Sequence, residues 1–204
     1  MTQRIANPCT PVRFRVVPPY FLLGIEYTAE LIKKAEMIDK EFDIIIFGAT
    51  SFVGQIMTRH IKEKFNNSSL NWAVAGRSKE KLKKLSKDIG LYEIKTIIAD
   101  ANDESALKAL CARTKIVVST VGPYALYGST LVKICAETGT DYCDLTGEPQ
   151  WIKKMQETYG KTAIDSGARI VHCCGFDSIP SDLGVHFLQQ KALKKTGQTC
   201  NKIN

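Results

Sequence analysis

The sequence lacks several features that would place it in a class at once. No apolar run reaches the roughly 18 residues needed to cross a bilayer. The seven cysteines are odd in number and include no Cys-x-x-Cys pair, which argues against a disulfide framework and favours a reducing compartment. We therefore expect an intracellular protein without a transmembrane segment, in the cytoplasm first, with an organelle or a lipid surface as alternatives.

Acidic residues are missing from the first 25 positions, which contain four prolines. Pro18 and Pro19 interrupt the apolar stretch 16–25 and no small-residue cleavage site is evident, so a secretory signal is not indicated. We expect residues 1–41 to form a partly irregular extension, with a short helix over 28–40. The net charge of +7 permits anionic partners. However, the lysines of 79–87 lack interleaved aromatic or arginine residues, so no nucleic-acid site is predicted.

The stretch 42–65 has the pattern of a nucleotide-binding turn. Residues 44–47 form an apolar run typical of a strand buried on both faces of a parallel sheet. Gly48 ends that strand, and apolar residues then recur at helical spacing over 52–65. A glycine turn at a helix N-terminus lets a pyrophosphate approach unpaired N–H groups. We predict cofactor contacts from this turn, with an ordinary tight turn as the alternative, at Gly48, Thr50, Ser51, Phe52, Val53 and Gly54. A P-loop is excluded because no Gly-Lys-Ser/Thr follows.

Strands and helices alternate after this unit. We predict strands over 71–75, 94–99, 116–119, 141–145 and 169–174, and helices over 78–88, 103–112, 129–137 and 149–165. With the first strand, this pattern predicts an α/β fold: a Rossmann-type, doubly wound parallel sheet of order 3-2-1-4-5-6. The cofactor domain is expected over 42–176. Residues 177–204 are expected to begin the connection to a second, substrate domain that is largely absent.

The end of the second strand indicates which nicotinamide cofactor binds. A carboxylate there would accept from the free ribose 2′-hydroxyl of NAD and repel a 2′-phosphate. This chain instead has Arg77 and Ser78, with no acid before Glu80. A guanidinium matches a phosphate geometrically, so NADP is favoured over NAD. The alternative is that Arg77 is a solvated turn residue.

Two later strand ends carry further candidates. Asp100, after the third strand, could accept from the adenine amino group of the cofactor or cap the following helix. Val121, Gly122 and Pro123 follow the fourth strand, across from Gly48, where their backbone could border the pyrophosphate and nicotinamide ribose. The tyrosines at 124 and 127 could reach a substrate, with buried structural tyrosines as the alternative.

His172, Cys173 and Cys174, together with Cys143, raise the possibility of a metal site. On a strand over 169–174, consecutive side chains would face opposite ways. The spacing matches no zinc pattern, and we predict no metal site. Small buried hydrophobic positions explain the cysteines better.

Five motifs in order resemble the saccharopine dehydrogenase-like oxidoreductases, the group that includes the trans-acting enoyl reductases. The motifs are Phe-Gly-Ala-Thr-Ser-Phe-Val-Gly at 47–54, Trp-Ala-Val-Ala-Gly-Arg-Ser at 72–78, Val-Gly-Pro-Tyr with Tyr-Gly at 121–128, Asp-Leu-Thr-Gly-Glu-Pro-Gln at 144–150, and Gly-Phe-Asp-Ser-Ile-Pro-Ser-Asp-Leu-Gly at 175–184. The sequence departs from the family at Ser51, where glycine is usual, and in the 40 residues that precede the match. Family members also continue for a roughly equal length beyond the matched region.

The resemblance implies hydride transfer between NAD(P)H and a small-molecule or lipid-type substrate, and it indicates no catalytic residue within the motifs. The sequence lacks the Tyr-x-x-x-Lys pair that a short-chain dehydrogenase needs. A non-catalytic NADP-binding or scaffold module is the alternative from another class. Apolar residues of 176–188 lack an evident partner surface, so self-association is expected. We also expect this chain alone to be catalytically incomplete.

Overall fold

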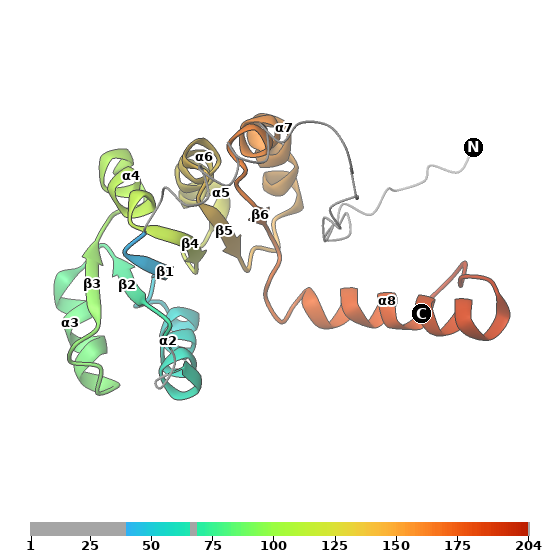
Figure 1. Cartoon of the computed structure of the whole chain (residues 1–204), viewed down its shortest axis with the longest axis horizontal. Helices are drawn as coiled ribbons and strands as arrows, with labels where there is room; N and C mark the ends of the chain where they lie inside the picture. Colours follow the sequence, from blue (N-terminus) through green and yellow to red (C-terminus); the bar gives the residue numbers. More distant parts are fainter. Residues whose placement is uncertain (1–39, 66–68, 204) are drawn as a thin grey trace, which may run out of the picture.

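The computed structural model describes residues 40–65 and 69–203. The predicted extension over 1–41 and its helix over 28–40 therefore lie outside the described residues, except for Lys40 and Glu41. A six-stranded parallel sheet forms the centre of the molecule (Figure 1). Its strands are β1 (Phe42–Phe47), β2 (Trp72–Gly76), β3 (Lys95–Ile98), β4 (Thr114–Ser119), β5 (Asp141–Asp144) and β6 (Ile170–Val171).

The strand order is β3-β2-β1-β4-β5-β6, which confirms the predicted topology. β1 pairs with β2 on one side and β4 on the other, so Ile46 stands opposite both Val74 and Val118. The chain first builds outward from β1 to β3 and then returns to the other side of β1 with β4. The carboxyl ends of β1 and β4 therefore form the switch point at which ligands bind in open α/β sheets.

Seven helices are described, and those that pack on the sheet form a layer on each of its faces (Figure 1). Ile45 and Phe47 of β1 face one apolar cluster with residues of α4, α6 and α7, while Ile46 faces a second cluster with residues of α2 and α3. This alternation buries β1 on both faces, as its uninterrupted apolar run predicts. The helices are α2 (Phe52–Phe65), α3 (Lys79–Asp88), α4 (Glu104–Ala112), α5 (Tyr124–Tyr127), α6 (Ser129–Thr138), α7 (Pro149–Ser166) and α8 (Ile179–Thr196).

Local sequence signals explain where these helices begin and end. Ser78 caps α3 by accepting from the Lys81 N–H, and Asp103 caps α4 in the same way. Gly139 adopts φ 68° and closes α6, as predicted. Pro149 stands at the first position of α7, where its missing N–H removes no helical hydrogen bond.

The inward face of α2 differs from the prediction. The buried residues of this helix are Gly54, Thr58 and Ile61, not the whole apolar stripe. Phe52 is 80% exposed, and Ile56 and Phe65 are also exposed. The helix packs closely against β1 at Gly54, and Thr58 and Ile61 follow on the same inward face, while Phe52, Ile56 and Phe65 lie on the outer side.

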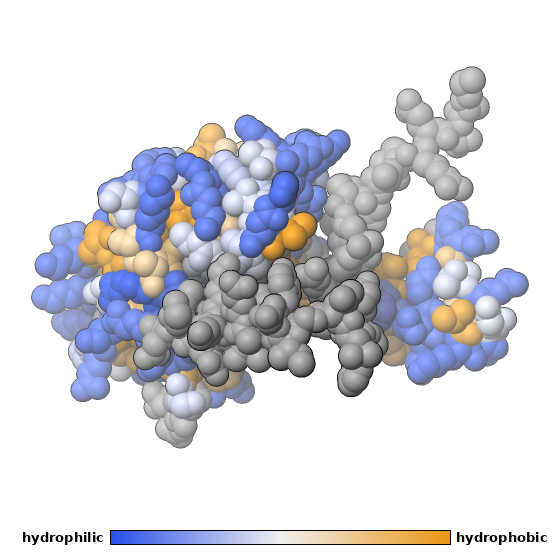
Figure 2. All heavy atoms as spheres, turned by 45° about the horizontal axis from the view of Figure 1, so that its top comes forward, coloured by the Kyte–Doolittle hydropathy of each residue, from blue (hydrophilic) through white to orange (hydrophobic). Residues whose placement is uncertain are grey.

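The sixth strand is shorter than predicted, and a helix that was not predicted follows it. β6 ends at Val171 because Cys173 takes a positive φ of 63°, which leaves the extended conformation. α8 has no buried residue and extends away from the sheet and its helices (Figure 1). Apolar surface on this projecting part of the molecule is visible in Figure 2.

Candidate cofactor site

The turn after β1 requires glycine at two positions. Gly48 has φ 86°, and a Cβ there would lie 2.6 Å from Cγ2 of Val121. At Gly54 a Cβ would lie 2.3 Å from the carbonyl oxygen of Gly48. The first glycine therefore lets the chain turn beside the end of β4, and the second lets α2 begin directly against β1. These are two of the roles that the glycines of a dinucleotide-binding turn serve.

Hydroxyl groups connect the turn to the end of β4. Oγ1 of Thr120 donates to the Gly48 carbonyl oxygen at 2.9 Å and lies 3.0 Å from Oγ of Ser51. The Gly54 N–H donates to the same Ser51 oxygen at 3.0 Å. Ser51 stands where the family usually has glycine. Its hydroxyl oxygen accepts the hydrogen bond of the Gly54 N–H, so this amide near the start of α2 is not available to a ligand.

Two other amides at the start of α2 remain open. In residues 40–65 and 69–203, neither the Phe52 N–H nor the Val53 N–H donates to a protein acceptor. The first turn of α2 also contains no acidic side chain. Unpaired N–H groups and the positive end of the helix dipole together favour an anion at this position. Thr50 belongs to the same turn, and its carbonyl oxygen accepts a hydrogen bond from the Gln55 side-chain amide.

Arg77 lies on the surface immediately after β2. In the described part of the chain its guanidinium has no hydrogen-bond or ion-pair partner. The Ser78 hydroxyl, in contrast, is already engaged: it accepts from the Lys81 N–H at 3.2 Å and donates to Glu80 at 3.0 Å. Of the two predicted phosphate contacts at this strand end, Arg77 is therefore the one whose donors are available.

The structure contradicts one of the two predicted roles of Asp100, because another residue caps the following helix. One of its carboxylate oxygens accepts from the Asn102 N–H at 2.9 Å within a turn. Asp103, not Asp100, caps α4. The second carboxylate oxygen of Asp100 has no protein partner among the residues described here.

The segment after β4 reaches the carboxyl edge of the sheet, as predicted. Val121 packs beside Gly48, and Gly122 and Pro123 are exposed. Glu148 then holds the short helix α5, because its carboxylate accepts from the N–H groups of Tyr124 (2.7 Å) and Ala125 (2.9 Å).

The two candidate tyrosines have different environments. Tyr124 is buried, and its hydroxyl donates to the Ser119 carbonyl oxygen at 3.0 Å. Burial raises the pKa of Tyr124 to about 12. Tyr127 is 36% exposed, so the expectation of buried tyrosines is confirmed for the first and wrong for the second.

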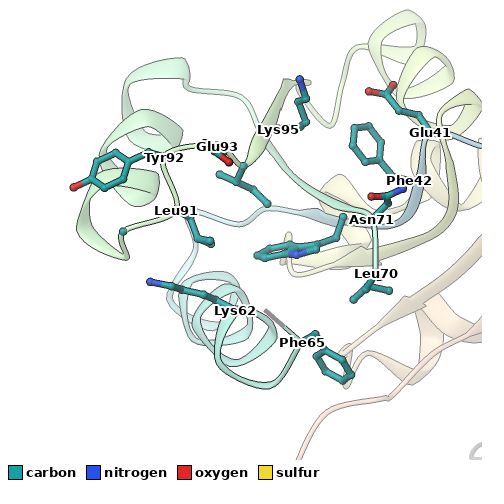
Figure 3. Close-up of a pocket in the computed structure, with 13 residues that line it drawn as sticks. Glu41, Phe42, Lys62, Phe65, Leu70, Asn71, Leu91, Tyr92, Glu93 and Lys95 are labelled. Atoms are coloured by element: carbon teal, nitrogen blue, oxygen red, sulfur yellow. The ribbon is translucent and has the colours of Figure 1, made fainter. Parts of the chain in front are cut away.

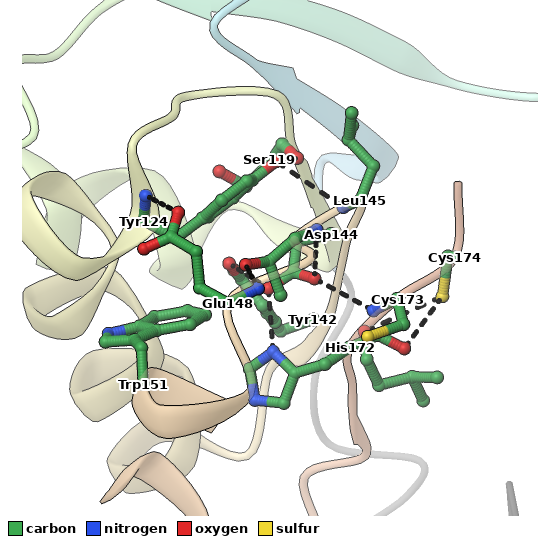
Figure 4. A network of polar contacts seen from close by, with 12 residues as sticks. Ser119, Tyr124, Tyr142, Asp144, Leu145, Glu148, Trp151, His172, Cys173 and Cys174 are labelled. Atoms are coloured by element: carbon green, nitrogen blue, oxygen red, sulfur yellow. Dashed lines mark hydrogen bonds and ion pairs between the residues drawn. The ribbon is translucent and has the colours of Figure 1, made fainter. Parts of the chain in front are cut away.

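A buried polar network at the ends of β5 and β6 was missed by the sequence reasoning (Figure 4). The Asp144 carboxylate accepts from the Tyr142 hydroxyl at 2.9 Å and lies 2.7 Å from Nδ1 of His172. Its other oxygen accepts from the backbone N–H groups of Thr146 and Cys173. The one signal available in the sequence is that Asp144 and Thr146 belong to the motif at 144–150.

The cysteines near this network are not the small buried residues that were predicted. Cys174 is exposed, and the Cys143 thiol beside it is partly buried. A hydrogen bond from Cys143 lowers the pKa of Cys174 and, with burial, raises the pKa of Cys143 well above its usual range. Because the chain leaves the strand after Val171, the predicted alternation of side chains over 172–174 is also wrong. Among the cysteines of residues 40–65 and 69–203, Cys111 and Cys135 are buried, with their sulfurs 3.7 Å apart.

A cavity of about 720 Å³ lies away from this site (Figure 3). It opens at the amino ends of the strands, where Phe42, Trp72 and Lys95 are the first residues of β1, β2 and β3. In an open α/β sheet the ligand binds at the opposite, carboxyl edge. We therefore assign the cofactor site by the geometry of the turn and not by cavity size.

A match to a protein-family profile shows which family this chain belongs to. The profile of the family described as "Saccharopine dehydrogenase NADP binding domain" matches residues 44–171. The chain belongs to this family. NADP is accordingly the cofactor of the domain, and the matched range extends from within β1 to the end of β6.

Individual relatives agree with this membership. The chain is 43% identical over 166 residues to a trans-acting enoyl reductase of Mycobacterium tuberculosis and 42% identical over 165 residues to that of Mycobacterium leprae. These matches cover 80% and 79% of this chain but only 39% of each relative. Apo saccharopine dehydrogenase (L-Glu forming) of Saccharomyces cerevisiae has the same fold, with a TM-score of 0.57 and 21% identity over 72% of this chain and 32% of that one.

Residues 40–65 and 69–203 contain neither a metal-binding cluster nor a membrane-spanning helix. Between residues 40 and 203, omitting 66–68, no group of three or more His, Cys, Asp or Glu side chains is placed to hold a metal ion. Within the same residues, no helix has the length and apolar character needed to span a membrane.

Proposed function

We propose that the chain is the NADP-binding part of an oxidoreductase that reduces the double bond of an enoyl group on a lipid-type substrate. The nicotinamide of NADPH would deliver a hydride to the β-carbon, and a proton added at the α-carbon would complete the saturated product and NADP⁺. The family assignment supports the cofactor. The relatives named trans-acting enoyl reductases, at 42–43% identity, support the reaction class.

The observation that carries the proposal is the open N-terminus of α2, together with an arginine that has no partner among residues 40–65 and 69–203. The amides of Phe52 and Val53 are available to a pyrophosphate, and the guanidinium of Arg77 is available to a 2′-phosphate. Gly48, Thr50, Ser51 and Gly54 would shape the turn around the phosphates. Val121, Gly122 and Pro123 would border the nicotinamide ribose, and Asp100 would accept from the adenine amino group.

The domain boundary is part of the same proposal. We place the cofactor domain at 42–176 and a connecting segment at 177–204, because α8 has no buried residue and contributes nothing to either core cluster. The wall that holds the substrate against the nicotinamide would come from outside this chain's cofactor domain. Such a wall is needed because hydride transfer requires a positioned substrate and the exclusion of water.

Calorimetric titration with NADPH and NADH tests cofactor recognition. We expect NADPH to bind more tightly, and Arg77→Asp to weaken NADPH binding by about 1.5–3 kcal/mol through loss of a charge-assisted contact and added repulsion. Arg59→Asp, an equal change of charge at an exposed position of α2, is the matched control and should leave affinity nearly unchanged. Equal affinity for the two cofactors in the unchanged chain would contradict the assigned role of Arg77.

A second experiment separates the enzyme from a non-catalytic NADP-binding module. NADPH absorbance is followed after addition of an enoyl thioester with a long acyl chain, using this chain alone and then a form extended to the length of its relatives. We expect oxidation of NADPH by the extended form and turnover well below about 1 per second by the chain alone. NADPH binding without oxidation by either form would favour the binding module.

A further inference from the structure

Two thiol groups meet beside the carboxyl ends of β5 and β6. Cys143 belongs to β5 and is partly buried. Cys174 follows the end of β6 and is exposed. Neither cysteine is among the residues predicted to contact the cofactor. A reaction at these sulfurs would therefore be separate from cofactor binding.

The backbone that carries Cys174 is fixed against the end of β5 (Figure 4). The N–H groups of Cys173 and Cys174 donate to Asp144, the first to Oδ1 at 3.2 Å and the second to the carbonyl oxygen at 2.7 Å. The next residue packs as closely, because a Cβ at Gly175 would lie 2.9 Å from Cβ of Leu145. The chain after β6 is therefore held in one position relative to β5.

This arrangement brings the two sulfurs into contact. The Cys143 thiol donates a hydrogen bond to the sulfur of Cys174. The Cys174 thiol lies 3.6 Å from the carbonyl oxygen of Val171 and 3.9 Å from that of His172. An S–H group is a weak donor, so these two contacts do not hold the sulfur in place. Because the two backbones already lie side by side, a disulfide of about 2.05 Å requires rotation of the side chains and no rearrangement of the strands.

The two thiols differ in reactivity. Cys174 is exposed, and the hydrogen bond from Cys143 lowers its pKa, so it is the thiol that forms a thiolate in reach of a solute. The same hydrogen bond, together with burial, raises the pKa of Cys143. An exposed thiol of lowered pKa beside a second thiol is typical of cysteines that peroxides oxidise. Cys111 and Cys135 also form a contact pair, but both are buried.

We propose that Cys174 and Cys143 form a reversible oxidation site that reacts with peroxides. The Cys174 thiolate attacks one oxygen of hydrogen peroxide, an S–O bond forms as the O–O bond breaks, and the departing hydroxide takes a proton to become water. The sulfur of Cys143 then attacks the sulfenic acid of Cys174. An S–S bond forms as the S–O bond breaks, and the hydroxyl group leaves with the Cys143 proton as a second water.

The electrons balance in this sequence, since two thiols lose two electrons in total and one peroxide gains them. A small dithiol returns the two electrons and restores both thiols. The disulfide would join β5 to the segment that leads from β6 to α8. The proposal does not depend on the enoyl reductase function, because it uses neither the cofactor nor the turn that binds it.

Peptide mapping after treatment with hydrogen peroxide tests the pairing. Trypsin releases Cys143 in the peptide 134–153 and Cys174 in the peptide 170–191. A small molar excess of peroxide should join these two peptides within one chain, and dithiothreitol should separate them. Each peptide contains a second cysteine, so fragmentation of the joined peptides identifies the bonded pair.

Serine variants and a sulfenic acid trap test the order of the two steps. In Cys143→Ser the sulfenic acid at Cys174 has no partner thiol, so dimedone should label it at least fivefold more than in the unchanged chain. Cys174→Ser should give no cross-link. Cys173→Ser, a change at the neighbouring position, is the matched control and should still give it. In the unchanged chain Cys174 should be oxidised at least tenfold faster than Cys200, which is also exposed.

Four results would overturn the proposal. They are no cross-link at peroxide concentrations that oxidise Cys200, a cross-link between different chains only, a bond to Cys173 in place of Cys174, or no dimedone adduct at Cys174 in a folded Cys143→Ser variant. If Cys143→Ser proves unfolded by circular dichroism, Cys143→Ala repeats the trapping. The mapping of the unchanged chain decides the pairing in either case.

Discussion

At the scale of single residues, Tyr124 shows how burial controls a titrating group. Its hydroxyl donates to the Ser119 carbonyl oxygen and accepts from the Leu145 N–H at 3.4 Å. Burial raises its pKa from the ordinary value of 10.0 to about 12. The folded protein therefore retains a proton that the unfolded chain releases above pH 10.

This difference predicts a loss of stability in alkali. Between pH 10 and about 12 the unfolded state binds fewer protons than the folded state, so the free energy of unfolding falls as pH rises. For Tyr124 the fall should be about 1.4 kcal/mol per pH unit at most. Urea unfolding at pH 9 and pH 11 measures it. Tyr124→Phe should be less stable at pH 9 and lose less on going to pH 11. An identical loss in both proteins would contradict the assignment.

Cys174 leads to a second prediction at this scale. Its thiol is exposed and its pKa is lowered by the hydrogen bond from Cys143, so it holds more thiolate at neutral pH than an ordinary cysteine. We expect iodoacetamide to alkylate Cys174 faster than Cys200, which is also exposed, as followed by peptide mass mapping over time. Cys143→Ser, which replaces the thiol donor by a hydroxyl, tests the cause. Faster modification of Cys200 than of Cys174 would argue against it.

Residue roles were predictable from the sequence where the chemistry is local. Gly48, Ser51 and Gly54 lie within seven positions, and their shared turn follows from spacing alone. Asp144 and His172 are 28 residues apart and meet only because β5 and β6 pair in register. That register depends on the packing of the sheet, which a single sequence does not reveal. The exposure of Cys174 was also not predictable, because it follows from the positive φ of Cys173, where the chain leaves the direction of β6.

At the scale of elements, the contact between β1 and α2 depends on Gly54. A Cβ at this position would lie 2.3 Å from a backbone oxygen and 2.8 Å from Cα of Ala49. Because backbone atoms cannot give way as a flexible side chain can, Gly54→Val should destabilise the fold by about 2–3 kcal/mol and weaken NADPH binding.

Gly76→Ala is the matched control for this prediction. Gly76 ends β2, and a Cβ there would lie 3.8 Å from its nearest neighbours, an ordinary contact distance. Its free energy of unfolding, measured in urea, should therefore change by less than about 1 kcal/mol. If Gly54→Val were as stable as Gly76→Ala, the close approach of α2 to β1 would not be required.

Element types were largely predictable, and the exceptions have physical causes. The sheet order, the cap at Ser78 and the first residue of α7 follow from apolar runs and terminal signals. α5 has four residues and is held by Glu148, which comes more than twenty positions later. α8 escaped prediction because its apolar residues do not gather on one face and none is buried.

At the scale of the whole molecule, α8 presents apolar surface that the rest of the described chain does not cover. Leu183, Phe187 and Leu188 of this helix are all exposed. We expect reversible self-association at micromolar concentrations, seen by sedimentation velocity as a rise in sedimentation coefficient with concentration. Leu183→Glu with Phe187→Glu should reduce it. Lys194→Glu with Lys195→Glu, a charge change near the end of the same helix, should not reduce it to the same extent. A concentration-independent monomer would contradict the prediction.

The hydroxyl bridge between Ser51 and Thr120 has a consequence for the kinetics and thermodynamics of cofactor capture. It fastens the turn after β1 to the end of β4 through side chains that belong to the fold itself. A loop already fixed in its bound shape loses little conformational entropy when a ligand arrives. The Gly54 amide, which donates to Ser51, should therefore exchange its hydrogen with solvent slowly even in apoprotein. Cofactor association should proceed without a slow ordering step, as a single exponential whose rate increases linearly with NADPH concentration.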